Sequence, residues 1–114
     1  MLKYNEAMKL LNSTYEITLG IQAFLCDSAE DHFADIASYY TARKPILDEL
    51  SKYLSSPEVG TLTQRQRELM NDKIQEVITF DKQNIALIDE KVKIAKNSIK
   101  KLNSQKSLLI YSKS

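Results

Sequence analysis

The C-terminal half of the chain contains no helix-breaking residue. After Gly60 neither glycine nor proline occurs, and the 114 residues include only two of each. Sheets need such residues at their turns, whereas the Lys, Glu, Leu, Ile, Ser and Ala that dominate this chain favour long helices. Thr61 and Thr63 are each followed three residues later by glutamine, the spacing of a capping box at a helix start. The sequence therefore predicts one long helix over residues 61–111.

Apolar residues recur along this helix at alternating spacings of three and four. Such a period of 3.5 residues is typical of coiled-coil packing. We call this line the predicted seam; its positions are Ile74, Ile78, Asp81, Ile85, Ile88, Val92, Ala95, Ile99, Leu102, Lys106 and Leu109. All are apolar except Asp81 and Lys106. A polar seam residue such as Asp81 often selects a partner or a register, and the alternative is partial exposure at a helix bend.

Two further helices are expected before the long one. Apolar residues at helical spacing predict helices over residues 2–26 and 28–54. Pro45 predicts a kink in the second helix or its division in two, and residues 55–60 form a loop that contains a proline and a glycine. We therefore expect an all-α fold, an antiparallel bundle of three to four helices or a coiled coil, in a single helical domain over residues 1–114.

The expected helices differ in length. At 1.5 Å per residue the third would reach roughly 70 Å, against about 35 to 40 Å for the other two. Either the third helix breaks near Asn103 and Ser104, or its last turns extend past the bundle with their apolar face uncovered. Both alternatives leave a C-terminal apolar stripe that needs a neighbour, which can be the chain itself, a second copy or another protein.

Charge is unevenly distributed along the chain. Residues 1–60 have five basic and nine acidic side chains, a net charge of −4, whereas residues 61–114 have eleven and six, a net charge of +5. From Lys91 onward there are seven lysines and no acid. A solvated helix face explains these lysines, because nucleic-acid binding usually adds arginines and several aromatic residues, and this tail has only Tyr111.

No arrangement of residues predicts an enzyme or a cofactor site. His32 is the only histidine and Cys26 the only cysteine, so neither a metal site nor a nucleophilic pair is expected. The two glycines cannot form a phosphate-binding loop. No apolar run approaches the roughly 20 residues of a membrane span, and the N-terminus has no signal-peptide pattern, so a cytoplasmic location is expected.

Several segments resemble a known family in their layout. These are Ile46–Leu50 after Arg43, Ile78–Asn84 at the head of the heptad helix, Ile99–Leu102 near its end, and the final Lys106, Leu109 and Tyr111. Over about residues 28–111 the chain resembles the flagellar export chaperones of the FliT type, with the FlgN type as a near second. The resemblance implies a small cytoplasmic helical protein that binds the C-terminal helix of a late flagellar export substrate and delivers it to the export machinery.

The predicted function is that of a helical binding protein, with the C-terminal stripe as a groove for an amphipathic helix of a protein client. The candidate partner-binding residues are Asp81, Ile85, Ile88, Val92, Ala95, Ile99, Leu102, Leu109 and Tyr111. Two alternatives remain: a structural coiled-coil protein that associates with itself as a homodimer, and a helical protein that binds nucleic acid through its lysine-rich tail.

Overall fold

A computed structural model describes residues 2–27 and 31–113, with side chains up to residue 103. It contains α1 (Tyr4–Cys26), α2 (Phe33–Leu54), the short 3₁₀ helix η1 (Pro57–Thr61) and α3 (Gln64–Lys113), and the described residues form no strand. The predicted all-α fold with a long C-terminal helix is confirmed. The chain divides into two compact units, residues 1–84 and residues 85–114.

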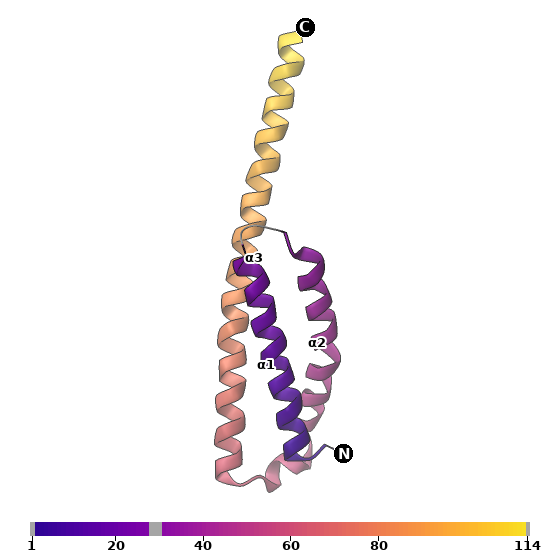
Figure 1. Cartoon of the computed structure of the whole chain (residues 1–114), viewed down its shortest axis with the longest axis vertical. Helices are drawn as coiled ribbons and strands as arrows, with labels where there is room; N and C mark the ends of the chain where they lie inside the picture. Colours follow the sequence, from indigo (N-terminus) through magenta and orange to yellow (C-terminus); the bar gives the residue numbers. More distant parts are fainter. Residues whose placement is uncertain (1, 28–30, 114) are drawn as a thin grey trace. The chain divides into compact units, whose positions relative to one another are not determined.

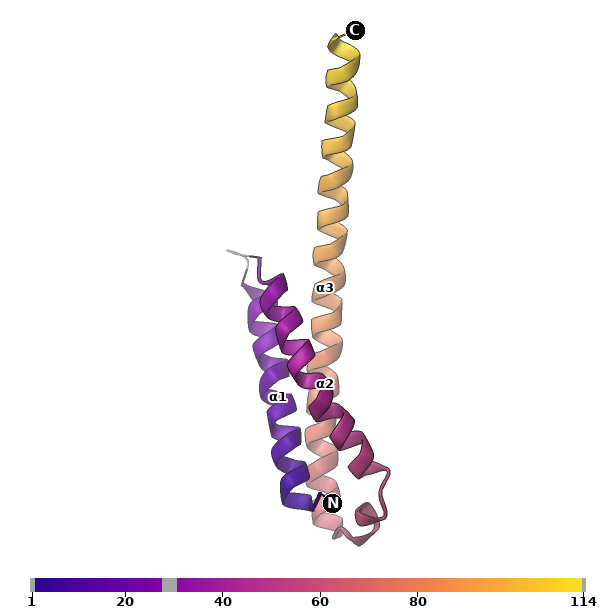
Figure 2. The ribbon, with the colours of Figure 1, turned by 90° about the vertical axis from the view of Figure 1, so that its right-hand side faces the viewer.

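The first unit is a three-helix bundle. In both views α1, α2 and the 64–84 part of α3 lie side by side and run up, down and up (Figure 1, Figure 2). The residues that α1 buries are spaced alternately by four and three, as in coiled coils: Ala7, Leu11, Thr14, Thr18, Ile21 and Leu25. From α2 the bundle buries Ile36, Arg43, Leu50 and Tyr53, and from α3 it buries Met70, Val77 and Asn84.

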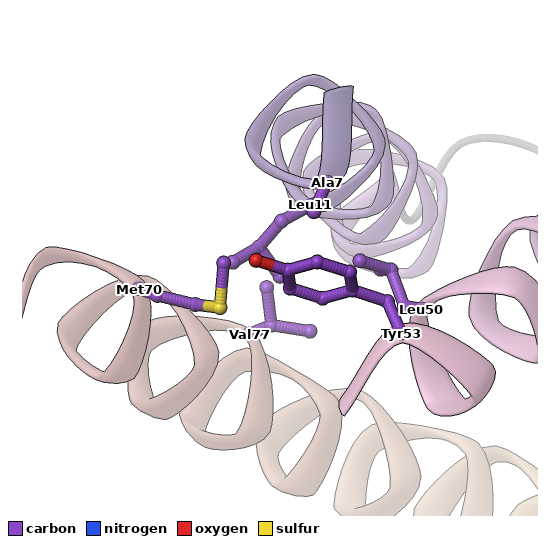
Figure 3. Close-up of a cluster of buried hydrophobic side chains, with 6 residues drawn as sticks. All are labelled: Ala7, Leu11, Leu50, Tyr53, Met70 and Val77. Atoms are coloured by element: carbon purple, nitrogen blue, oxygen red, sulfur yellow. The ribbon is translucent and has the colours of Figure 1, made fainter. Parts of the chain in front are cut away.

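One end of this bundle is apolar. Figure 3 shows Leu50 and Tyr53 of α2 between two side chains of α1 and two of α3, and the six residues of this cluster are Ala7, Leu11, Leu50, Tyr53, Met70 and Val77. The hydroxyl of Tyr53 is buried there without a hydrogen-bond partner among the described residues. Burial raises the pKa of this phenol above its ordinary value, and the nearby Glu58 acts in the same direction.

Local signals explain where α2 and α3 begin. The Thr63 hydroxyl accepts a hydrogen bond from the Gln66 amide at 3.1 Å, and the Gln66 side chain accepts one from the Thr63 amide at 3.0 Å. This reciprocal pair is the predicted capping box. α2 begins at Phe33, whose amide donates to the Asp31 carboxylate, and the expected start at Ser28 lies outside the described residues. The helix continues through Pro45, and α3 continues through Asn103 and Ser104, so neither predicted break is present.

Gly20 allows α1 and α2 to approach closely. The helix runs through this glycine, and a Cβ added there would overlap Cε2 of Tyr39 and lie 3.1 Å from its Cδ2. The Tyr39 ring also packs edge-on against Phe24, with 5.2 Å between the ring centroids. The glycine therefore makes room for an aromatic contact between two helices.

We expect the effect of Gly20→Ala on stability to change sign with residue 39. Alanine is favoured over glycine inside a helix by about 1 kcal/mol, but with Tyr39 present the overlap should outweigh this gain and lower the free energy of unfolding. In a Tyr39→Ala background the same change should raise that free energy by up to about 1 kcal/mol. Chemical denaturation of the four chains measures this, and an effect of the same sign in both backgrounds would contradict it.

Candidate protein-binding surfaces

The second unit exposes an apolar line along its single helix. We call this line the C-terminal stripe; its residues are Ile85, Ile88, Val92, Ala95, Ile99 and Leu102. Of these side chains, Ile85 is 55% exposed, Val92 40%, and Ile99 and Leu102 57% each. Ile88 is partly buried and Ala95 is exposed. The side chains of Leu109 and Tyr111, also predicted to contact a partner, lie outside the described side chains.

This stripe is narrow. At 100° per residue its members fall within about 100° of the helix circumference, the width of a coiled-coil seam or of one side of an amphipathic helix. Ile94 is an equally exposed isoleucine, at 59%, but it lies well away from the stripe. The two positions therefore provide a matched comparison, since Ile94 and Ile99 have the same side chain and similar exposure.

Two lysines border the C-terminal stripe, and Asp89 lies on the same edge as one of them, Lys96. Lys96 directly follows Ala95 and Lys91 directly precedes Val92, so each lies at an edge of the stripe. Lys93 and Lys100 lie farther around the helix, outside the stripe, and are exposed. Long lysine stems can cover the rim of an apolar contact while the ammonium groups remain in water. Such a surface can hold an apolar helix with acidic edges.

The bundle has an apolar cleft of its own, of about 340 Å³, within residues 1–84. One wall is formed by Leu47, Leu50 and Leu54 of α2 and the other by Ile74 and Ile78 of α3. Leu47, Leu54 and Ile78 remain more than a third exposed. The first two residues of the predicted seam thus line an open cleft and do not form the centre of the core.

The buried side of α3 coincides only in part with the predicted seam. Met70, Val77 and Asn84 face the bundle at intervals of seven residues, whereas Ile78 and Ile85 are exposed. Ile74 and Asp81 of the predicted seam are partly buried, so the seven-residue period is correct. The prediction is wrong at Ile78 and Ile85, because the residue before each of them is the one that packs inward. Ile78 and Val77 are both apolar, so hydrophobicity alone does not show which of them packs inward.

A polar layer joins the three helices near the end of the first unit. Nη1 of the buried Arg43 on α2 donates to the Thr18 hydroxyl at 2.9 Å and to Oδ1 of Asp81 at 2.6 Å. Nδ2 of the fully buried Asn84 donates to the Thr18 carbonyl at 3.1 Å, and the Thr18 hydroxyl donates to the Thr14 carbonyl at 2.7 Å. Asp81, predicted as a polar seam residue, thus binds a cation of its own chain.

Sequence reasoning did not identify Arg43, Thr18 or Asn84 as members of this layer. One signal was present, since Arg43 falls seven residues from both Ile36 and Leu50 and so shares their side of α2. The guanidinium also lies 5.0 Å from the centre of the Tyr40 ring. Burial raises the pKa of that phenol, and the positive charge of Arg43 opposes the rise.

The described residues contain no group of three or more His, Cys, Asp and Glu side chains able to hold a metal ion. Cys26 is exposed, and Nε2 of His32 lies 2.8 Å from Oδ2 of Asp27. No helix in the described part of the chain is long and apolar enough to span a bilayer.

Comparison of the chain with protein-family models, with curated proteins and with solved structures finds no match.

Proposed function

We propose that this chain is a helical binding protein that holds an amphipathic helix of a protein client against the C-terminal stripe. The observation that supports this most directly is the exposure of the stripe. Ile85, Val92, Ile99 and Leu102 follow heptad spacing, yet each keeps at least 40% of its surface exposed. An apolar stripe at coiled-coil spacing gains free energy when a second helix covers it, at about 25 cal/mol per Å² of apolar surface buried.

The resemblance in layout to the flagellar export chaperones of the FliT type supports one class of client. In this proposal the client is the C-terminal helix of a late flagellar export substrate, such as the filament cap. The chain acts in the cytoplasm as a chaperone for that helix and prevents its early assembly. The bundle of residues 1–84 provides a folded body from which α3 continues into the binding stripe.

The proposal can be tested with peptides that match the C-terminal helices of the filament-cap and hook-associated proteins encoded by the same genome. We expect fluorescence anisotropy to show binding of at least one peptide by the unaltered chain. Ile99→Asp or Leu102→Asp should weaken that binding at least about 100-fold, because the contact loses a buried aliphatic side chain and gains a carboxylate that must be desolvated.

The matched control is Ile94→Asp, which introduces the same charge on the same helix at an equally exposed position off the stripe. We expect it to change peptide binding by less than about threefold, since a surface substitution away from a contact has little effect. Circular dichroism should show similar helix content for all variants. If Ile94→Asp and Ile99→Asp weakened binding equally, or if the unaltered chain bound none of the peptides, the proposal would be wrong.

A further inference from the structure

The C-terminal stripe is symmetric about a point between Lys93 and Ile94. Three pairs of stripe residues lie at equal distances from this point, and they are Ile85 with Leu102, Ile88 with Ile99, and Val92 with Ala95. When two identical helices pack antiparallel around that point, the residues of each pair face one another across the contact. Every layer is then apolar, and the small Ala95 faces the larger Val92 of the second copy.

The charges beside the stripe fit the same arrangement. Asp89 directly follows Ile88, and Lys96 directly follows Ala95, so both lie on the same edge of the helix. In the antiparallel pairing Asp89 of each copy lies next to Lys96 of the other, which gives two symmetry-related pairs of opposite charge.

Parallel pairing of two copies fits less well. In register, Ala95 would face Ala95 of the second copy, which leaves a gap in the middle of the contact. Lys91 would lie next to Lys96 of the second copy, and this repulsion would occur twice. The pattern of side-chain size and the pattern of charge thus favour the same orientation independently.

We propose that the chain forms an antiparallel homodimer in which the C-terminal stripes of two copies cover each other. This proposal rests on the proposed function because both concern the same surface. The second copy covers the stripe to which a client helix binds. Self-association then protects the stripe in the absence of client, and client binding is coupled by mass action to dissociation of the dimer.

Charge reversal tests the register. Sedimentation equilibrium of the purified full chain should show a monomer–dimer equilibrium. Asp89→Lys or Lys96→Asp alone should raise the dimer dissociation constant roughly tenfold, because two attractive pairs become repulsive. The double variant Asp89→Lys/Lys96→Asp should restore it to within about threefold. The control Glu90→Lys makes the same change of charge at the next, exposed position, outside the proposed contact, and should have the smaller effect.

Cysteine cross-linking tests the orientation. In a Cys26→Ser background, Ile85→Cys and Leu102→Cys chains oxidised as a mixture should form the mixed disulfide dimer. Each variant alone should remain largely uncrosslinked, since its two cysteines would be roughly 25 Å apart along the antiparallel pair. Disulfides formed by each variant with itself, a monomer at every concentration, or a double charge reversal no tighter than the single ones would overturn the proposal.

These measurements use the chain without a client and are independent of the peptide experiment. A dimer that meets both tests but binds no peptide supports this inference and refutes the proposed client binding. A monomer that binds peptide through Ile99 refutes the homodimer and leaves the proposed function standing.

Discussion

Replacing Arg43 with alanine is expected to lower the free energy of unfolding by about 2 to 4 kcal/mol. The guanidinium binds the carboxylate of Asp81 and the hydroxyl of Thr18 and so connects all three helices of the bundle. Its loss leaves the Thr18 hydroxyl without one donor and Asp81 without its cation. Because the Asp81 side chain keeps 28% of its surface in water, hydration recovers part of the loss. We therefore expect a smaller loss of stability than the largest losses seen when a fully buried ion pair is broken.

Chemical denaturation followed by circular dichroism measures this change. Lys44→Ala is the matched control, since it removes a neighbouring positive charge from an exposed position on the same helix and should cost less than about 0.5 kcal/mol. The double variant Arg43→Ala/Asp81→Ala should lose less free energy of unfolding than the two single variants lose in sum. The reason is that each single change leaves the other charge without its partner. Equal losses for Arg43→Ala and Lys44→Ala would show that the polar layer contributes little.

Replacing Ile21 with alanine should lower the free energy of unfolding by about 2 to 5 kcal/mol. Ile21 is fully buried on α1 and is the largest side chain of the described core with no accessible surface. The change removes buried aliphatic groups and leaves a cavity that the neighbouring helices can close only in part. Since small domains are stable by only about 5 to 15 kcal/mol, this one change can remove much of the stability of the chain.

The control for this prediction is Ile94→Ala, which removes the same atoms from a side chain that is 59% exposed. It should change the free energy of unfolding by less than about 0.5 kcal/mol. Both variants can be followed by thermal and chemical denaturation. Similar losses at the two positions would mean that Ile21 is not packed as described.

The helices, and the start of the long one, follow largely from local signals that the sequence contains. The absence of glycine and proline after Gly60 predicts the long C-terminal helix, and the spacing of Thr63 and Gln66 predicts its cap, because both depend on the chemistry of neighbouring residues. Pro45 shows where such signals are not decisive. It predicts a kink or a break, and the break is absent because α2 runs on to Leu54. Contacts with the rest of a fold can offset one lost hydrogen bond.

The candidate binding surface could also be predicted in part from the sequence. Heptad spacing identified Ile85, Val92, Ile99 and Leu102 as one apolar line, and the structure leaves all four exposed. In the bundle the same reasoning placed the seam at Ile78, although Val77 is the residue that packs inward. Residues spaced by seven form a row along the helix surface, and neighbouring rows have the same spacing. The period therefore indicates the type of packing but not which row is buried.

The sequence by itself therefore determined the helical class, the long third helix, its cap and the heptad period, because these depend on residues close together in the chain. Only the tertiary structure decided which side of α3 faces the bundle and that Arg43, Thr18 and Asn84 are buried polar residues. Their hydrogen bonds join α1, α2 and α3 across 25 to 66 residues of sequence. A buried polar side chain is tolerated only where it has hydrogen-bond partners. Here those partners lie on other helices and come within reach only once the helices have packed.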